Sequence, residues 1–220
     1  MQINADLGQR AVLQTEDMAW VDSPMAGVQR RMLERDGEDG SRRATSVVRY
    51  APNSHFSPHT HGGGEEFLVL AGTFSDDQAD YPAGTYVRNP PGSRHTPHSH
   101  DGTVIFVKLQ QFAPDDGEHV VIDTNTQPWT AGPIAGVEVM LLHAHGSERV
   151  ELQRWEAGTR KESSDQSDGE EIFVLEGSLE DEHGRYPKGT WLRHPPGGIP
   201  ERWSRDGCKL YLKTGHLGAV

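Results

Sequence analysis

The feature that most constrains the fold of this chain is an internal duplication. Gly64–Gly72 (GEEFLVLAG) recurs as Gly169–Gly177 (GEEIFVLEG). Tyr81–Gly92 (YPAGTYVRNPPG) recurs in the same way as residues 186–197 (YPKGTWLRHPPG). Both recurrences are displaced by 105 residues, as from residue 64 to residue 169. A displacement of this length is typical of a repeated domain, so we expect the 220 residues to fold as two copies of one unit.

The duplication also indicates where the two copies meet. Trp20–Val28 (WVDSPMAGV) is similar to Trp129–Val137 (WTAGPIAGV), here displaced by 109 residues, as from residue 20 to residue 129. The difference of four residues falls in a polar stretch of the first copy, where an insertion costs little. The connector between the copies is expected in Ala113–His119, which contains Pro and Gly. We therefore predict domains at residues 1–116 and 117–220.

Each copy has the composition and spacing of a turn-rich β domain. The chain contains 25 Gly and 14 Pro, which helices tolerate poorly. No segment combines helical periodicity with helix caps. Short apolar runs between turn sequences predict strands in the first copy at Ala44–Tyr50, Glu66–Ala71, Thr85–Arg88 and Thr103–Gln110. Strands of this length and spacing indicate an all-β fold, with a small antiparallel barrel or jelly roll in each copy.

Charge and hydropathy exclude several classes of partner. The formal net charge of −12 argues against binding to nucleic acids or to anionic membranes, since both are negatively charged. The first twenty residues carry no signal-peptide pattern, and no apolar stretch is long enough for a membrane span. The single cysteine, Cys208, cannot form an intramolecular disulfide. We therefore expect a cytoplasmic protein.

Histidines concentrate in the first copy in a pattern that favours metal binding. Six of the 12 histidines lie between residues 55 and 100. His59 and His61 are two positions apart, so on an extended strand their side chains leave the same face. Glu65 follows the flexible Gly62–Gly64, and His95 must arrive from a different strand. Imidazoles and a carboxylate that converge in this way suit one divalent transition metal, such as Fe, Zn, Mn, Ni or Cu.

The same residues resemble the two motifs of the cupin superfamily. Residues 59–72 (HTHGGGEEFLVLAG) are similar to the first motif, G-x5-H-x-H-x3,4-E-x6-G, apart from its leading glycine. Residues 84–95 (GTYVRNPPGSRH) match the second motif, G-x5-P-x-G-x2-H, throughout. More narrowly, Ala44–Gly72 resembles the cupin domain of the ChrR-like anti-sigma factors. The resemblance implies two tandem cupin barrels (double-stranded β-helix or jelly roll), with a metal inside the first.

The second copy serves as an internal control for the metal site. At the displacement of 105 residues, the three histidines are replaced by Ser164, Gln166 and Pro200. A proline side chain cannot bind a metal, so no comparable site is expected in the second copy. Glu65, by contrast, persists as Glu170. We predict Glu65 as the fourth ligand; in the alternative, this glutamate only caps backbone amides at the start of a strand.

Three further histidines lie near the predicted ligands in sequence. His55, His98 and His100 are candidates for contacts with the metal ligands or with a substrate. In the alternative interpretation they are solvated or hydrogen-bonded surface residues. His98 and His100 correspond to Trp203 and Arg205 in the second copy, so neither position requires an imidazole. The sequence assigns no catalytic residue.

The predicted site is compatible with an enzyme. Four protein ligands around a six-coordinate ion leave two adjacent positions, at which a metal can act as a Lewis acid or bring O2 and substrate together. A divalent ion and one carboxylate leave a net charge of +1, which favours an anionic chelating small molecule. The first hypothesis is therefore an iron-dependent dioxygenase of the cupin type that acts on small enolisable substrates.

Two alternatives remain open. The resemblance to ChrR implies a metal-bearing sensory or regulatory protein. The regulatory relatives bind a sigma factor through an N-terminal zinc domain with His and Cys ligands, and residues 1–45 contain neither residue type, so a sigma-factor partner is disfavoured. The other alternative is a closed structural zinc, against which the histidine-free second copy argues. The sequence is also compatible with a homodimer.

Overall fold

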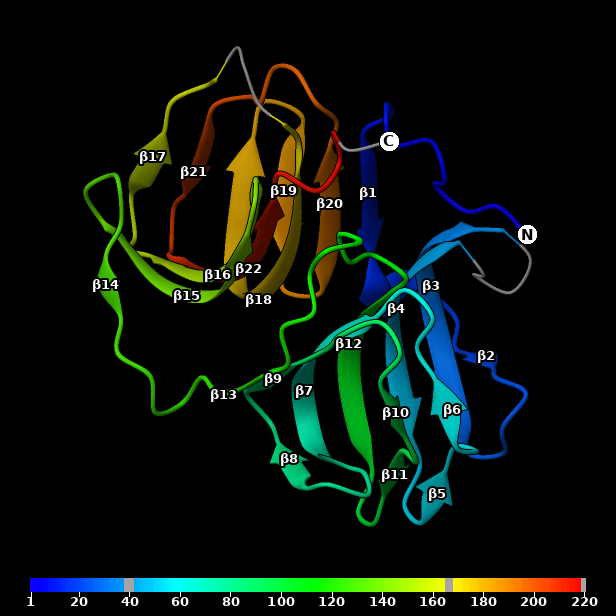
Figure 1. The fold of residues 1–220 in the computed structure, drawn as a ribbon. Helices are drawn as coiled ribbons and strands as arrows, with labels where there is room; N and C mark the ends of the chain where they lie inside the picture. Colours follow the sequence, from blue (N-terminus) through cyan, green and yellow to red (C-terminus); the bar gives the residue numbers. More distant parts are fainter. Residues whose placement is uncertain (38–41, 165–167, 219–220) are drawn as a thin grey trace. The chain divides into compact units, whose positions relative to one another are not determined.

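The computed structural model describes residues 1–37, 42–164 and 168–218, and within these ranges it contains strands and one 3-10 turn but no α-helix (Figure 1). It divides into two compact units. The first comprises residues 1–5 and 18–127, and the second comprises residues 6–17 and 128–220. The predicted all-β fold is confirmed. The described part of the chain has no helix with the length and hydropathy of a transmembrane span.

The first unit is an antiparallel sheet that curls around an apolar interior. Its strands are β2 (Val21–Asp22), β3 (Val28–Asp36), β4 (Arg43–Tyr50), β5 (Ser54–His55), β6 (His59–Thr60), β7 (Glu65–Ser75), β8 (Asp80–Pro82), β9 (Thr85–Asn89), β10 (Arg94–His95), β11 (His98–Ser99), β12 (Thr103–Leu109) and β13 (Val120–Asp123). The main sheet has the order β13-β9-β7-β12-β4-β3-β2, and β6 pairs with β10 in a separate two-stranded sheet. The four strands predicted from the sequence correspond to β4, β7, β9 and β12, and they are confirmed.

Alternation along the strands creates the core of the first unit. Phe67 and Val69 on β7 lie opposite Val107 and Ile105 on β12, and all four are buried. They belong to one apolar cluster that also includes Tyr50 and eight other buried or partly buried side chains, namely Val28, Val48, Phe56, Phe74, Tyr81, Val87, Leu109 and Met25. Because this interior offers few polar partners, a charged group that points into it needs a specific counterpart.

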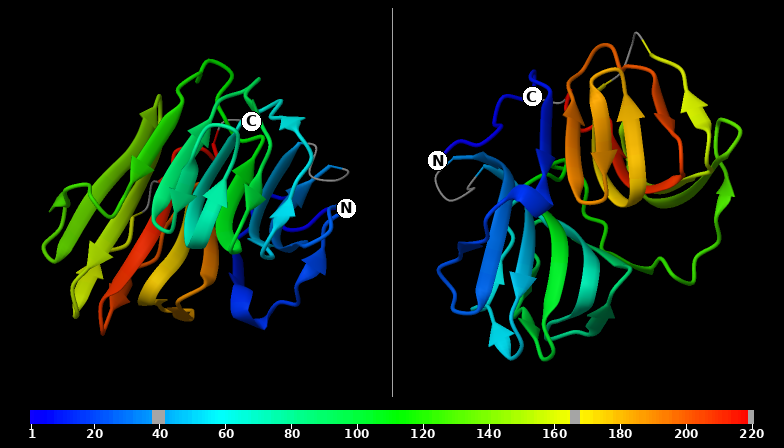
Figure 2. Two further views of the ribbon diagram at one scale, coloured as in Figure 1. Left: turned by 90° about the horizontal axis from the view of Figure 1, so that it is seen from below. Right: turned by 180° about the vertical axis from the view of Figure 1, so that it is seen from behind.

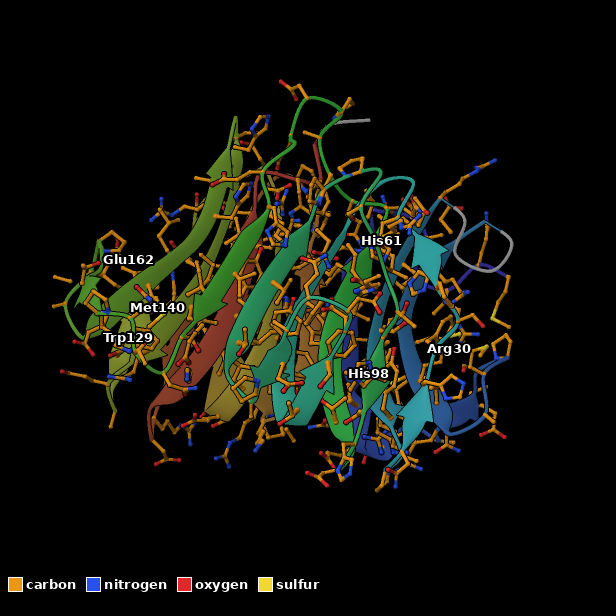
Figure 3. The ribbon with its side chains drawn as sticks, turned by 60° about the horizontal axis from the view of Figure 1, so that its bottom comes forward. Arg30, His61, His98, Trp129, Met140 and Glu162 are labelled. Carbon is orange, nitrogen blue, oxygen red and sulfur yellow. The ribbon has the colours of Figure 1, made fainter. Side chains whose placement is uncertain are left out.

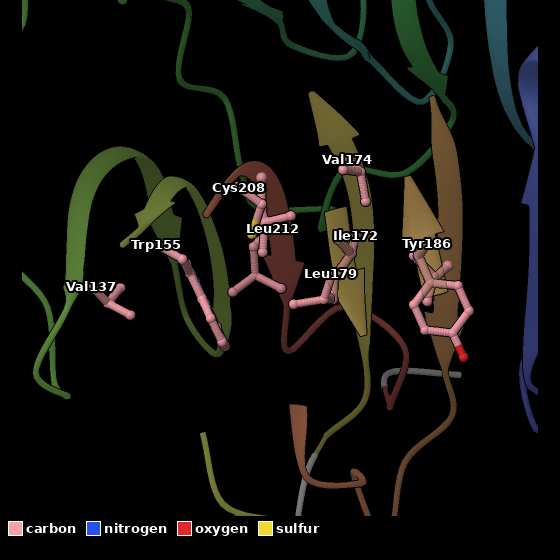
Figure 4. Close-up of a cluster of buried hydrophobic side chains, with 10 residues drawn as sticks. Val137, Trp155, Ile172, Val174, Leu179, Tyr186, Cys208 and Leu212 are labelled. Carbon is pink, nitrogen blue, oxygen red and sulfur yellow. The ribbon is translucent and has the colours of Figure 1, made fainter. Parts of the chain in front are cut away.

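The second unit repeats this architecture. It contains β1 (Ala11–Gln14), the 3-10 turn η1 (Thr15–Asp17), β14 (Thr130–Ala131), β15 (Val137–His145), β16 (Glu148–Trp155), β17 (Thr159–Lys161), β18 (Glu170–Asp181), β19 (Gly184–Pro187), β20 (Thr190–His194), β21 (Arg202–Ser204) and β22 (Cys208–Thr214). The strand order of its main sheet is β1-β20-β18-β22-β16-β15-β14. Its apolar cluster includes Trp155, Ile172, Val174 and Leu179, all at most 3% exposed (Figure 4).

The first strand of each copy completes the sheet of the other copy. The blue strand β1 pairs with the orange β20 in the second unit, whereas β13, which occupies the same place in the second copy, pairs with β9 in the first (Figure 2). The two junctions are equivalent in detail. The Thr15 hydroxyl donates to the carbonyl oxygen of Gly189 at 2.7 Å, and the Thr124 hydroxyl donates to that of Gly84 at 2.6 Å.

Because of this exchange, the two compact units do not coincide with the predicted domain ranges 1–116 and 117–220. Residues 6–17 belong to the second unit, and residues 117–127 belong to the first. The prediction followed the period of the sequence repeat, and a repeat records the order of the strands along the chain. Which sheet an edge strand joins depends on pairing between residues far apart in sequence, such as Ala11 with Arg193.

Candidate metal centre

Four side chains of the first unit bring their ligand atoms together. His59, His61, Glu65 and His95 each offer one ligand atom, and these atoms lie within 4.8 Å of one another. The Nε2 atoms of His61 and His95 each lie 3.5 Å from Oε2 of Glu65. His61, Glu65 and His95 are buried, and His59 is half-buried. The structure thus brings together the four residues that the sequence predicts as ligands.

Short strands and turns produce this convergence. His59 on β6 lies directly opposite His95 on β10 in an antiparallel pair, which places their side chains on one face. The backbone N–H of His61 donates to the carbonyl oxygen of Ser93 at 2.9 Å. The chain then returns through Gly64, which has a φ of 81° and whose hypothetical Cβ would lie 2.3 Å from the Phe112 ring. A glycine is therefore required for Glu65 to begin β7 facing the histidines.

Contacts on the outer side of the histidine rings fix their orientation. The Nδ1 atoms of His59 and His95 lie 2.9 Å from the Ser57 carbonyl oxygen and 3.1 Å from a carboxylate oxygen of Asp76. Both oxygens can only accept, so Nδ1 carries the proton and the Nε2 lone pair is directed elsewhere. Nδ1 of His61 lies 3.0 Å from the Ser93 hydroxyl. Such partners of metal-binding histidines set the tautomer and the ring angle.

The donor set fits a divalent cation. The Nε2 atoms of His61 and His95 are buried and have no hydrogen-bond partner. A buried nitrogen lone pair without a partner is costly, and a carboxylate oxygen 3.5 Å away supplies no proton to it. A cation placed among these atoms would satisfy both lone pairs and the charge of Glu65. The amide of Asn89 also donates to Oε2 of Glu65, at 3.2 Å.

The electrostatics of the two buried rings differ. Burial lowers the pKa of His61, although the charge of Glu65 opposes this shift. Burial also acts to lower the pKa of His95, but the hydrogen bond that His95 donates to Asp76 and the charge of Glu65 outweigh it, so this pKa is raised. His95 therefore lies between two carboxylates, those of Glu65 and Asp76, which favour a cation nearby.

In the second unit, positively charged side chains lie beside the glutamate that corresponds to Glu65. Glu170, the counterpart of Glu65, is ion-paired with Arg202, and its Oε1 lies 3.1 Å from Nδ1 of His194. Although burial alone would raise the pKa of Glu170, the charge of Arg202 and the hydrogen bond with His194 lower it to about 2. Lys161 is nearby, and its pKa is lowered by burial and by the charge of Arg202. The positive charges of Arg202 and Lys161 thus compensate the negative charge of Glu170. The sequence comparison did not predict this arrangement.

The remaining candidate histidines do not join the centre. His55 and His98 lie opposite each other on β5 and β11, and both are exposed. His100 is 85% exposed and pairs with Asp101. The structure instead adds Asp76, whose counterpart Asp181 is also an aspartate. Because the sequence repeat retains this residue in both copies, it carried no signal that distinguished a metal site from the scaffold.

The fold and these motifs define a two-domain cupin. The chain belongs to the ChrR cupin-like domain family, whose family model matches residues 8–113 and again residues 117–218. This confirms the predicted tandem cupin barrels. Comparison with curated protein sequences finds no match.

Solved structures with a similar fold include a proposed dioxygenase, a salicylate 1,2-dioxygenase and a cupin 2 conserved barrel domain protein. The chain is similar to a proposed dioxygenase from Nostoc punctiforme PCC 73102, with 17% identity, a TM-score of 0.80, and coverage of 97% of this chain and 85% of that one. YlbA from E. coli has 14% identity, a TM-score of 0.73, and coverage of 97% and 94%. Salicylate 1,2-dioxygenase from Pseudaminobacter salicylatoxidans has 13% identity, a TM-score of 0.62, and coverage of 84% and 75%. At these identities the likeness establishes the fold alone.

Proposed function

We propose that this protein is a metal-dependent dioxygenase of small enolisable anions. His59, His61, His95 and Glu65 would hold one divalent ion, with Fe(II) as the metal in the cell. The observation that carries the proposal is the pair of buried Nε2 atoms without partners, aimed at a shared carboxylate. A bound ion of this kind can polarise a chelating substrate and bring O2 next to it, because four protein ligands leave two adjacent positions in octahedral geometry.

The residues around the centre would orient the ligands and exclude water. Asp76, Ser93 and the Ser57 carbonyl hold the three imidazoles in place. The Phe74 ring lies 6.0 Å from that of His95, and the Phe56 ring lies 5.2 Å from that of His59. Apolar walls of this kind strengthen electrostatic interactions at the centre and limit the hydrolysis of reactive species.

Tyr50, whose phenol is influenced by the charge of Glu65, would be the hydrogen-bond donor to a bound substrate. Its ring packs edge-to-face on Phe74, with centroids 5.7 Å apart. Burial raises the pKa of the Tyr50 phenol, and the negative charge of Glu65 raises it further. The phenol therefore stays protonated at neutral pH and can donate to a developing oxyanion.

The test is metal-dependent oxygen consumption. Protein purified without metal would be loaded anaerobically with one equivalent of Fe(II) and mixed with O2 and a panel of 1,3-diketones and 2-oxo acids. We expect oxygen uptake that depends on both Fe(II) and one substrate class, and that disappears in His59→Ala. Absence of metal-dependent turnover across the panel would reject the enzymatic proposal.

The family match supports a second candidate, a metal-bearing sensor. In that case the first unit would bind a small molecule or an oxidant without turnover and pass the signal to a protein partner. A pull-down with the metal-loaded full chain distinguishes the two. A stoichiometric sigma-factor partner, released by metal removal, would favour the sensor, whereas substrate turnover in the absence of any partner would favour the enzyme.

A further inference from the structure

An arginine of the first unit faces the interior of its barrel. Arg30, which is labelled in Figure 3, lies on β3 directly opposite Val48 on β4. Val28 lies opposite Tyr50 in the same pair of strands. Directly opposed residues of an antiparallel pair point to the same face of the sheet. Val28 and Tyr50 are members of the buried apolar cluster, and Val48 packs against it. The side chain of Arg30 therefore emerges on the face that surrounds the barrel interior.

Within the described part of the chain, the buried Nε of the half-buried Arg30 has no acceptor. The Nε atom of Arg30 is buried and has no hydrogen-bond partner, and no ion pair of Arg30 occurs among the described residues. Its neighbour Arg31, on the outer face, stacks on Trp20 and donates to the Met18 carbonyl oxygen. A guanidinium keeps its charge and its five donors at any physiological pH, so burying part of it without an acceptor is costly. The Arg30 guanidinium is therefore placed to donate a hydrogen bond to a bound ligand.

The second copy shows that the scaffold does not require this charge. At the displacement of 109 residues, Arg30 corresponds to Val139, which is buried and lies opposite Gln153 on β16. The copy that lacks the three histidines thus also lacks the arginine. A residue present only in the copy with the metal ligands is better explained by ligand binding than by folding.

We propose that Arg30 binds a carboxylate of the small molecule that occupies the first barrel. The substrate class is then a β-dicarbonyl or 2-oxo compound that carries a carboxylate in addition to its chelating oxygens. The chelating half of this inference rests on the proposed function. A divalent ion, Glu65 and Arg30 together give a net charge of +2, which selects anions over neutral analogues. The planar fork of an arginine also suits bidentate recognition of a carboxylate.

The experiment compares two probes that differ only in this group. Ni(II)-loaded full-length protein, which avoids turnover, would be titrated calorimetrically with 2,4-dioxopentanoate and with its methyl ester. Wild type is expected to bind the acid at least about tenfold more tightly than the ester. Arg30→Val, which installs the residue of the second copy, should weaken acid binding about 10- to 100-fold and leave ester binding unchanged. Arg30→Lys, which keeps the charge but not the fork, should fall between the two.

Two controls make the result decisive. Arg49→Val removes an exposed arginine that stacks on Trp20, and it should behave as wild type. Each variant must bind Ni(II) like wild type; if Arg30→Val does not fold, Arg30→Met, which keeps an unbranched aliphatic stem, provides the same comparison. Equal affinity of wild type for acid and ester, binding of neither probe, or an unchanged preference in the Arg30 variants would overturn the proposal. A lost acid preference in Arg30→Val without any Fe(II)-dependent oxygen uptake would support the carboxylate site while rejecting the dioxygenase.

Discussion

The carboxylate of Asp76 accepts a hydrogen bond from Nδ1 of His95 at 3.1 Å, on the side of the ring that faces away from Glu65. The same carboxylate accepts hydrogen bonds from the backbone N–H groups of Gln78 and Ala79. Burial would raise the pKa of Asp76, but these hydrogen bonds, that from His95 first, lower it. The turn after β7 thus holds an ionised group that sets the tautomer of His95.

We expect Asp76→Asn to weaken metal binding about 10- to 100-fold without unfolding the protein, because the amide no longer fixes the proton on Nδ1. Competition with a coloured chelator would measure the affinity for Zn(II) and Fe(II). Asp181→Asn provides the matched control, since Asp181 occupies the same position in the second unit and contacts Tyr186. An equal loss of affinity in both variants would contradict the assigned role of Asp76.

His59→Ala combined with His61→Ala should abolish stoichiometric metal binding and leave a folded β protein. The physical reason is that the second unit builds the same sheet without these histidines. Elemental analysis would give the metal content, and circular dichroism with thermal unfolding would report the fold. Global unfolding of the double variant would instead favour a structural metal.

Arg202→Met should destabilise the second unit by about 3–5 kcal/mol, because it leaves the buried carboxylate of Glu170 without its main counter-charge. Denaturant unfolding would measure the loss. Adding Glu170→Gln to Arg202→Met should recover part of the stability, since the uncompensated charge is then removed. If the single variant is as stable as wild type, the ion pair is not the element that replaces the metal in this unit.

The lowered pKa of Glu170 predicts that the free energy of unfolding depends on pH. The pKa of Glu170 is about 2 in the folded chain, compared with an ordinary value of 4.5. The unfolded chain therefore binds more protons between these values, so the contribution of Glu170 is complete above about pH 5 and is lost as the pH falls toward 2. The difference in unfolding free energy between wild type and Glu170→Gln should shrink over this range. A difference that is constant between pH 5 and pH 2 would be inconsistent with the lowered pKa.

Patterns that extend over a few residues predicted those features of the fold and the site that depend on residues close together in the sequence. The short apolar runs predicted four strands of the first unit, because the strand period acts over a few residues. The histidine spacing picked out His59, His61 and His95, which the structure brings together. The repeat keeps Arg88 as Arg193 in the copy without the three histidines, which indicates a role in the scaffold. In the structure Arg88 bonds Glu66 and Asp116 away from the four ligands.

Long-range partners could not be predicted in the same way. Asp76 lies 19 residues from His95, and its role depends on how the turn after β7 folds back. The compensation of Glu170 by Arg202 spans 32 residues and places a cation where the first copy has Pro97. Gln166, one of the three residues that replace the histidines, lies outside the described residues. These relationships depend on tertiary approach, for which a single sequence contains no periodic signal.

The exchange of edge strands imposes an order on biosynthesis. β1 is synthesised long before its partner β20, so the sheet of the second barrel cannot close until β20 has been made. β13, by contrast, follows its partner β9 closely, and the first barrel can close while the second is still being translated. The first barrel would therefore fold early in synthesis, while β1 stays unpaired until β20 has been made.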